Sequence, residues 1–167
     1  MTLGCQMILE RNILMGQSDI NIDGVLRLHY ELARSTKSHC SFKAGNQMIN
    51  ANDAMHFHVK KEIVAYLRDL SHITATNYIG VLNEQECLYS KEHPCHIIVQ
   101  ISPPSNRRMD APNWYPTVKA LMDGLTDAGV FKDDNDKVIT SFTFIPGTKT
   151  DNGLYHIDLE VRPGRFL

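Results

Sequence analysis

The chain has 167 residues, of which 43% are hydrophobic and 22% are charged, and its formal net charge is −2. This length fits one domain that can bury a core without disulfides or a structural metal. The composition is that of a soluble globular protein. The weak negative charge gives no global sign of nucleic-acid binding, so any DNA contact must come from a local basic patch and from a metal ion.

The first residues lack the features of a targeting segment. Residues 1–16 contain a single basic residue, Arg11, and no long apolar run, so they do not read as a signal peptide. No segment of the chain approaches the roughly 20 apolar residues needed to cross a bilayer. We therefore expect a cytoplasmic protein with no membrane partner, whose four cysteines are reduced.

Two cysteines and two histidines lie close together in the sequence, namely Cys87, His93, Cys95 and His96. Their spacings fit no common zinc finger or ribbon, and Pro94 lies among them at the start of an expected strand. The pattern therefore favours buried thiols and loop histidines over a zinc site.

The predicted organisation is an N-terminal extension over residues 1–40, followed by one domain over residues 41–167. Within the extension, Asp23 fits the cap of a helix that runs to about Lys37. The apolar face of that helix would comprise Val25, Leu28 and Leu32. A further strand is weakly indicated at residues 41–48.

The signals become stronger from residue 50. Asn52 or Asp53 fits the cap of a second helix. Its apolar stripe would contain Ile63, Val64, Leu67 and Leu70. The opposite face carries Lys60 and Lys61, which fit either a solvated surface or a phosphate contact.

The second half of the chain alternates strand and helix patterns. Residues 96–101 are almost wholly apolar and predict a strand in the interior of a sheet. Residues 116–129 predict a helix with Pro116 in its first turn and Gly129 as its stop. Two alternating segments, 138–145 and 155–162, predict strands joined as a hairpin. The expected fold is an α/β or α+β sandwich of two layers, with helices packed on a mixed β-sheet.

Acidic residues occur at both ends of the helix predicted over residues 116–129. Asp110 precedes it, and Asp133 and Asp134 follow it. If the flanking strands are neighbours in the sheet, the two loops could meet around Mg²⁺, which prefers carboxylate oxygens. The helix is on the order of 22 Å long, so the chain must double back for this to happen. In the alternative interpretation, Asp110 caps the helix and residues 133–136 form a solvated turn.

The order of motifs in this region is specific. It comprises Arg107-Arg108, Asp110-Ala111-Pro112-Asn113, Lys119, Asp123-Gly124-Leu125-Thr126-Asp127-Ala128-Gly129 and Asp133-Asp134. Over residues 41–162, this order closely resembles the RusA family of Holliday-junction resolvases, which is common in bacteriophages and prophages. The signature of that family is an Arg-rich run, Asp-x-Asp-Asn, a lysine one turn into a helix, an Asp-(Ala/Gly)-Leu-x-x-Ala-Gly stretch and an Asp-Asp pair.

The resemblance implies a role for each matching residue. Asp110 matches the first metal-binding aspartate, and Asp133-Asp134 matches the distal pair, whose second member is the metal ligand. Lys119 matches the catalytic lysine if three residues among 114–118 are an insertion. Asn113 matches the asparagine after the first acidic pair.

The resemblance also implies an activity. The expected protein is an endodeoxyribonuclease that requires Mg²⁺, with Mn²⁺ as a substitute, and that acts as a homodimer. It would nick four-way junctions or other branched DNA in recombination and repair, in the cytoplasm of a bacterial or phage-infected cell. Arg107, Arg108, Asn113, Lys60 and Lys61 would contact the DNA, chiefly through its backbone.

The chain departs from the family pattern at Pro112, where the second aspartate is expected. A proline side chain cannot bind a metal. In one outcome water fills the coordination position, and in another Asp136 or Asp123 supplies the oxygen. A third outcome is a protein that binds branched DNA and cuts it poorly. A different class again is a structural or regulatory phage protein, in which the acidic loops are merely surface.

Overall fold

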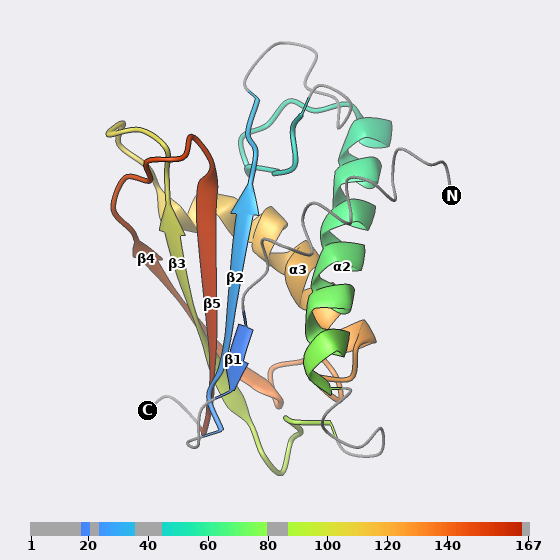
Figure 1. Cartoon of the computed structure of the whole chain (residues 1–167). Helices are drawn as coiled ribbons and strands as arrows, with labels where there is room; N and C mark the ends of the chain where they lie inside the picture. The colour runs from blue at the N-terminus through green and yellow to red at the C-terminus, as the bar shows by residue number, and fades with distance from the viewer. Residues whose placement is uncertain (1–17, 21–23, 36–44, 80–86, 165–167) are drawn as a thin grey trace.

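The computed structural model describes residues 18–20, 24–35, 45–79 and 87–164. They form a five-stranded mixed sheet in the order β1-β2-β5-β3-β4, with two long helices (Figure 1). Strands β3 and β4 are parallel, and the other neighbouring pairs are antiparallel. The elements are β1 (Ser18–Ile20), β2 (Leu26–Leu32), α2 (Phe57–Ile79), β3 (Cys95–Ser102), the 3-10 helix η2 (Ala111–Trp114), α3 (Tyr115–Asp127), β4 (Ile139–Pro146) and β5 (Tyr155–Pro163). The expected α+β fold is confirmed.

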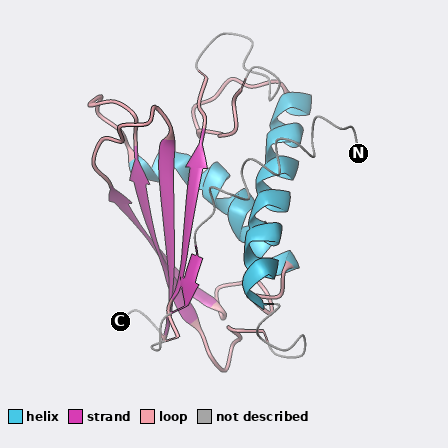
Figure 2. Cartoon of the chain, viewed as in Figure 1, coloured by secondary structure: helices cyan, strands magenta, loops and turns pink. Residues whose placement is uncertain are grey.

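Both long helices lie on the same face of the sheet, and the other face carries no described helix (Figures 1 and 2). The core lies between these two layers. Alternate strand residues face the helices and are buried: Leu26, Leu28, Tyr30, Leu32, Ile97, Val99, Ile101, Ile157, Leu159 and Val161. Each such apolar side chain contributes about 1.5–3 kcal/mol relative to an exposed one. The residues between them therefore occupy the open face.

Helices α2 and α3 are in close contact at Gly124. A Cβ atom at this position would clash with the backbone oxygen of Arg68 and with the side chain of Ser71. Beside this contact, Arg68 Nη2 donates a hydrogen bond to Asp127 Oδ1 at 2.6 Å. The missing side chain of Gly124 thus sets the position of α3, and with it the position of Lys119.

Two elements predicted in the second half of the chain are confirmed, namely strand β3 and helix α3. Strand β3 lies inside the sheet between β5 and β4, as its apolar run predicts. Helix α3 has Pro116 in its first turn, and Gly129 follows it with a φ of 79°, a conformation that favours glycine at a helix end. Its apolar stripe is buried at Val118 and Leu121.

The helix predicted from Asp23 to Lys37 is wrong, because residues 26–32 form strand β2. Val25, Leu28 and Leu32 fit a helical period, but Leu26, Leu28, Tyr30 and Leu32 fit a period of two, and these four are the buried residues. Pairing with β5 along the whole of β2 decides between the two patterns. This part of the predicted N-terminal extension therefore belongs to the central sheet.

The predicted hairpin of β4 and β5 is also wrong, because β3 lies between these two strands. The connection between them crosses the end of β3, where Gly147 N donates to Ile101 O at 2.7 Å and Thr150 N donates to Pro103 O at 2.9 Å. These bonds hold the connection over the end of the central strand. Alternation along a strand identifies the strand but does not identify its neighbour.

The cap predicted at Asn52 or Asp53 is wrong as well, because α2 begins at Phe57. The Asp53 carboxylate instead accepts a hydrogen bond from Asn50 N at 2.7 Å and binds Arg34. The apolar stripe of α2 is confirmed, since Ile63 and Leu67 are fully buried. Residues 45–48 form no strand, and residues 41–44 lie outside the described residues. None of the helices in the described ranges has the length and apolarity needed to span a membrane.

Candidate functional site

The loop that follows β3 leads directly into the acidic motif. Asp110 occupies the N-cap position of η2, with φ −103° and ψ 102°, but its side chain makes no capping hydrogen bond. The exposed Asp110 carboxylate therefore does not cap the helix, contrary to the helix-cap interpretation. Pro112 lies in the first turn of η2, where a fixed φ and a missing N–H cost nothing.

Asp110 lines an open cleft with a volume of about 840 Å³. Four separate segments of the chain form the walls. The lining includes three arginines (Arg34, Arg107 and Arg108), three asparagines (Asn50, Asn52 and Asn113) and the aromatic residues Trp114 and Tyr155. A cleft with several guanidinium groups, amides and one carboxylate is suited to an anionic ligand that also carries a divalent cation.

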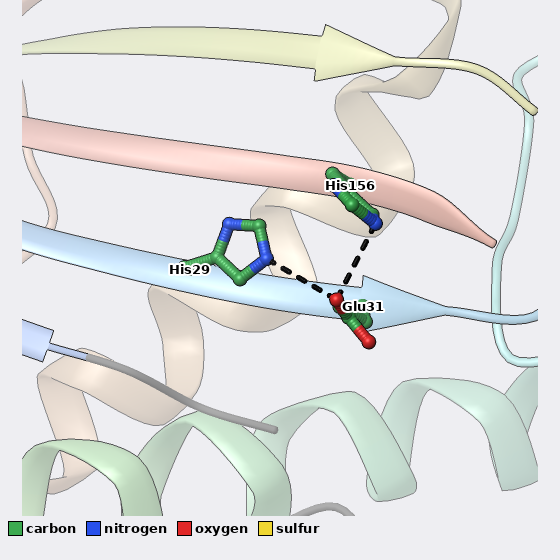
Figure 3. Close-up of side chains that lie close together, drawn as sticks. All are labelled: His29, Glu31 and His156. Carbon is green, nitrogen blue, oxygen red and sulfur yellow. Dashed lines mark ion pairs between the residues drawn. The ribbon is translucent and has the colours of Figure 1, made fainter. Parts of the chain in front are cut away.

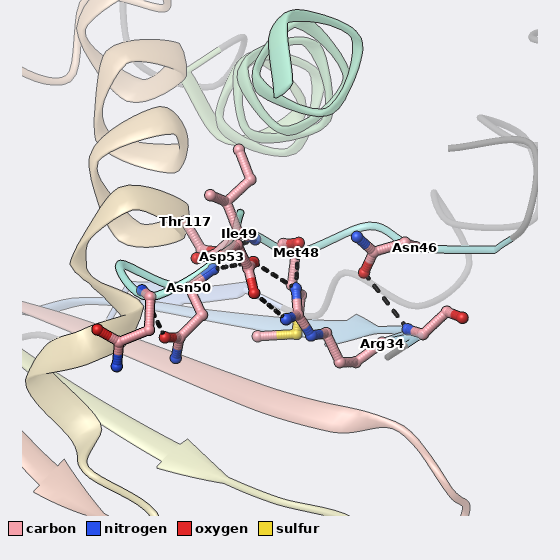
Figure 4. A network of polar contacts seen from close by, with 9 residues as sticks. Arg34, Asn46, Met48, Ile49, Asn50, Asp53 and Thr117 are labelled. Atoms are coloured by element: carbon pink, nitrogen blue, oxygen red, sulfur yellow. Dashed lines mark hydrogen bonds and ion pairs between the residues drawn. The ribbon is translucent and has the colours of Figure 1, made fainter. Parts of the chain in front are cut away.

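Arg34, which lines this cleft, is held by a network of polar contacts (Figure 4). Its guanidinium binds both carboxylate oxygens of Asp53, with Nη1 at 2.7 Å from Oδ2, and donates to Met48 O at 2.9 Å. The side chains of Arg34 and Asp53 are only 12% and 17% exposed. The pKa of Asp53 is lowered: burial opposes ionisation, but hydrogen bonds from Arg34 and from Asn50 N, with the charge of Lys60, outweigh it.

Trp114 connects Arg34 to the rest of the cleft. Its ring lies 5.3 Å from the Arg34 guanidinium carbon and 4.9 Å from the Tyr155 ring. The tryptophan is 5% exposed, and its Nε1–H has no hydrogen-bond partner among the described residues. Leaving such a buried donor unpaired costs about 1–3 kcal/mol.

A second group of charges lies on α3. The Lys119 ammonium donates to the carboxylates of both Asp123 and Asp134. Partial burial would lower the pKa of Lys119, but the hydrogen bonds to the two aspartates raise it. The same hydrogen bond from Lys119 lowers the pKa of Asp134. The loop after α3 therefore does turn back onto the helix, as the sequence argument requires, and it meets the helix at Lys119.

The neighbouring aspartate has a local structural role. Asp133 accepts hydrogen bonds from Asp134 N at 2.8 Å and from Asn135 Nδ2 at 2.7 Å. Asn135 Oδ1 in turn accepts one from Lys137 N at 2.9 Å. This loop is thus an exposed turn braced by its own side chains, as the structural interpretation of the acidic residues expects.

The predicted metal ligands are distributed over these two places. Asp110 lines the cleft, whereas Asp134 pairs with Lys119. In the described part of the chain, Asp110, Asp133 and Asp134 do not form a group with ligand atoms within 4.8 Å of one another. Cys87, His93, Cys95 and His96 form no such group either, and burial raises the pKa of the Cys95 thiol to about 12.

The predicted DNA-binding residues also separate. Arg107, Arg108 and Asn113 line the cleft. Lys60 is exposed near the start of α2, close enough to Asp53 for its charge to lower the pKa of that carboxyl. Lys61 is exposed on the same turn and is not part of the cleft wall.

Sequence reasoning missed Arg34, Asn50 and Tyr155. One signal could have indicated Arg34. The period-two pattern of residues 26–32 predicts a strand, and Arg34 lies two residues after the end of that strand. No local pattern indicates Asn50 or Tyr155, because only the tertiary fold brings these residues to the cleft. Comparisons of the chain with protein-family models and with curated proteins find no match in either set.

Proposed function

We propose that this protein is a metal-dependent endodeoxyribonuclease that cuts four-way junctions or other branched DNA, as its resemblance to the RusA family implies. The observation that carries the proposal is the cleft, which is lined by Arg34, Arg107 and Arg108 together with Asp110, whose carboxylate makes no helix-capping hydrogen bond. Guanidinium groups bind phosphates, and a free carboxylate among them offers an oxygen to a phosphate-bound cation.

The donor set of the cleft fits Mg²⁺. This ion is usually held by one or two carboxylates and completes its shell with waters and substrate phosphates, so Asp110 with the oxygens of Asn113 or Asn50 is a sufficient set. Water can then occupy the coordination position of the aspartate that Pro112 replaces. When bound, the ion would polarise the scissile phosphate and lower the pKa of an attacking water.

The protein groups have separate tasks in this proposal. Arg107 and Arg108 hold the phosphate backbone at the mouth of the cleft, where both are exposed. Arg34, fixed by Asp53, keeps the wall of the cleft rigid. Lys119 would neutralise charge on the phosphate oxygens, for which it must exchange a hydrogen bond with Asp123 or Asp134 for one with the substrate.

The proposed homodimer would present two equivalent clefts to the two strands that a junction resolvase must nick. A cytoplasmic site of action, in a bacterial or phage-infected cell, follows from the same resemblance. Mn²⁺ should replace Mg²⁺, because it accepts the same oxygen ligands.

A second candidate is a protein that binds branched DNA and cuts it weakly. The observation in its favour is that Asp110, Asp133 and Asp134 do not converge in the described structure, and that Pro112 removes the nearest further ligand. The basic cleft serves both candidates equally well. Cleavage separates them.

The test is cleavage of a labelled synthetic four-way junction, with a linear duplex as the substrate control, in Mg²⁺, Mn²⁺ or EDTA. Asp110→Asn and Asp134→Asn are compared with Asp69→Asn, which changes an exposed aspartate of α2. We expect paired nicks in the junction that need the metal, persist in Asp69→Asn and disappear in both Asp110→Asn and Asp134→Asn. Binding of the junction without cleavage in either metal would replace the enzyme with the second candidate.

A further inference from the structure

The open face of the sheet carries a group of charged and imidazole side chains on the adjacent strands β2 and β5. The register places His29 opposite Asp158 and Glu31 opposite His156. Because Tyr30 and Ile157 between them point into the core, these four side chains share the outer face. The group is separate from the cleft, whose lining contains none of its members.

Three of these side chains converge on one point (Figure 3). His29, Glu31 and His156 each offer a ligand atom, and the three atoms lie within 4.8 Å of one another. Glu31 Oε1 is 3.8 Å from His29 Nε2 and 3.4 Å from His156 Nε2. Ligands about 2.1 Å from a tetrahedral zinc ion lie about 3.4 Å apart, so the spacing is close to that of a bound ion.

Asp158 supplies the supporting contact that metal-binding histidines usually have. Its Oδ1 lies 2.6 Å from His29 Nδ1, which fixes the proton on Nδ1 and leaves the lone pair of Nε2 directed at Glu31. His156 Nε2 is also 3.1 Å from Asn152 Oδ1, so a bound ion would take the place of the proton shared with these oxygens. Both rings are already turned edge to face, with centroids 5.0 Å apart.

We propose that His29, Glu31 and His156 form a binding site for a zinc-class divalent ion, with Asp158 as the positioning residue for His29. Two imidazole nitrogens and one carboxylate oxygen suit Zn²⁺, Co²⁺, Ni²⁺ or Cu²⁺ better than Mg²⁺. The side chains of the three ligands are 22–29% exposed, so an ion can enter from solvent and keep a position for water. This site goes beyond the proposed nuclease centre and does not depend on it.

Cross-strand pairing alone gives a weaker account of the same contacts. Opposite charges facing each other across a sheet stabilise it modestly, and the pairs His29–Asp158 and Glu31–His156 would each do so without converging. In this structure both histidines also approach one carboxylate, Glu31. A single cation at that point would bind the ligand atoms of all three side chains.

The test is titration of the metal-free full chain with Zn²⁺ by calorimetry, together with the visible absorption of Co²⁺. We expect one Zn²⁺ per chain, an affinity lower by about 100-fold in His29→Gln, Glu31→Gln and His156→Gln, and a smaller loss of about 10-fold in Asp158→Asn. The matched control is His56→Gln with His58→Gln, the exposed pair with ring centroids 5.2 Å apart, which should leave the affinity unchanged.

Thermal unfolding in EDTA separates loss of the site from loss of the fold. The variants should unfold at the wild-type temperature in EDTA and lose the rise in Tm that Zn²⁺ gives the wild type. If a histidine variant does not fold, Glu31→Gln, which keeps the shape of the side chain, decides the matter. Absence of stoichiometric Zn²⁺ binding, retention of wild-type affinity in Glu31→Gln, or loss of binding in the His56 and His58 control overturns the proposal.

Discussion

In the cleft, three arginines and one aspartate line an open space, whereas on α3 a single lysine lies between two aspartates that already hold it. The same residue types therefore have different electrostatic consequences. The cleft retains positive charge that can bind an anion. The Asp110 carboxylate in it makes no helix-capping hydrogen bond. The α3 cluster of Lys119, Asp123 and Asp134 keeps one net negative charge, and Lys119 already binds both carboxylates. The cleft is thus the better candidate for the proposed DNA contact. In the α3 cluster, DNA binding would require Lys119 to exchange a hydrogen bond with an aspartate for one with a phosphate.

The largest expected effect comes from breaking the ion pair that holds the cleft wall. Arg34→Met leaves the largely buried Asp53 carboxylate without its partner, which should lower the free energy of unfolding by about 3–5 kcal/mol. Urea unfolding measures this loss. The double variant with Asp53→Asn should recover a substantial part of it, and equal losses in the single and double variants would show that the pair is not the cause.

Removing the exposed arginines should weaken DNA binding without unfolding the protein. Arg107→Ala with Arg108→Ala removes two phosphate contacts, so junction affinity should fall about 10-fold and the slope of log K against log salt should decrease by about 2. Fluorescence anisotropy at several salt concentrations measures both quantities. Lys91→Ala, in the exposed loop before β3, is the control, and an equal effect there would mean that the cleft has no special part in binding.

The ion pair of the cleft also predicts a dependence of stability on pH. The pKa of Asp53 is lower in the folded state than its unfolded value near 3.9, so its contribution is present above that value and is lost as the pH falls through the folded pKa. The free energy of unfolding, measured with urea at several pH values between about pH 5 and pH 2, should therefore fall less steeply with decreasing pH in Asp53→Asn than in the wild type. Identical pH profiles would remove Asp53 from the account of acid unfolding.

The smallest change in stability is expected at the α3 cluster. Lys119→Met should alter the free energy of unfolding by no more than about 1 kcal/mol, because the Lys119 side chain is 42% exposed and its ion pairs are screened. Junction cleavage should nevertheless fall at least 10-fold, while Mn²⁺ affinity should not fall, since Asp123 and Asp134 lose a competing cation. A drop in Mn²⁺ affinity would instead make Lys119 a support for the metal site.

The sequence predicted the elements that have strong periodicity and missed what depends on pairing. The helix from Tyr115 and the strands β3, β4 and β5 follow from apolar spacing and from Pro116 and Gly129. Strand β2 was mistaken for a helix because Leu28 and Leu32 fit both periods. The hairpin error arose because alternation within β4 and β5 carries no information on β3, which separates them.

In the candidate site, too, residues close in sequence could be predicted, whereas residues joined only by the tertiary fold could not. Arg107, Arg108, Asp110 and Asn113 are close together in the sequence, and all four line the cleft. Arg34 joins them only through the sheet, and Asp53 was assigned to a helix cap although it holds Arg34. The prediction that one metal joins Asp110 to Asp134 remains a prediction, because the described structure places these residues in different groups of contacts.

The most direct test of the account separates binding from cutting at Asp110. Junction affinity is measured in Ca²⁺ and the single-turnover cleavage rate in Mg²⁺, for the wild type and for Asp110→Asn. We predict that the variant keeps its affinity and that its cleavage rate falls about 100-fold or more, because the carboxylate acts in the reaction and the arginines act in binding. A variant that cuts at the wild-type rate would contradict the assignment of Asp110 and the proposed nuclease centre.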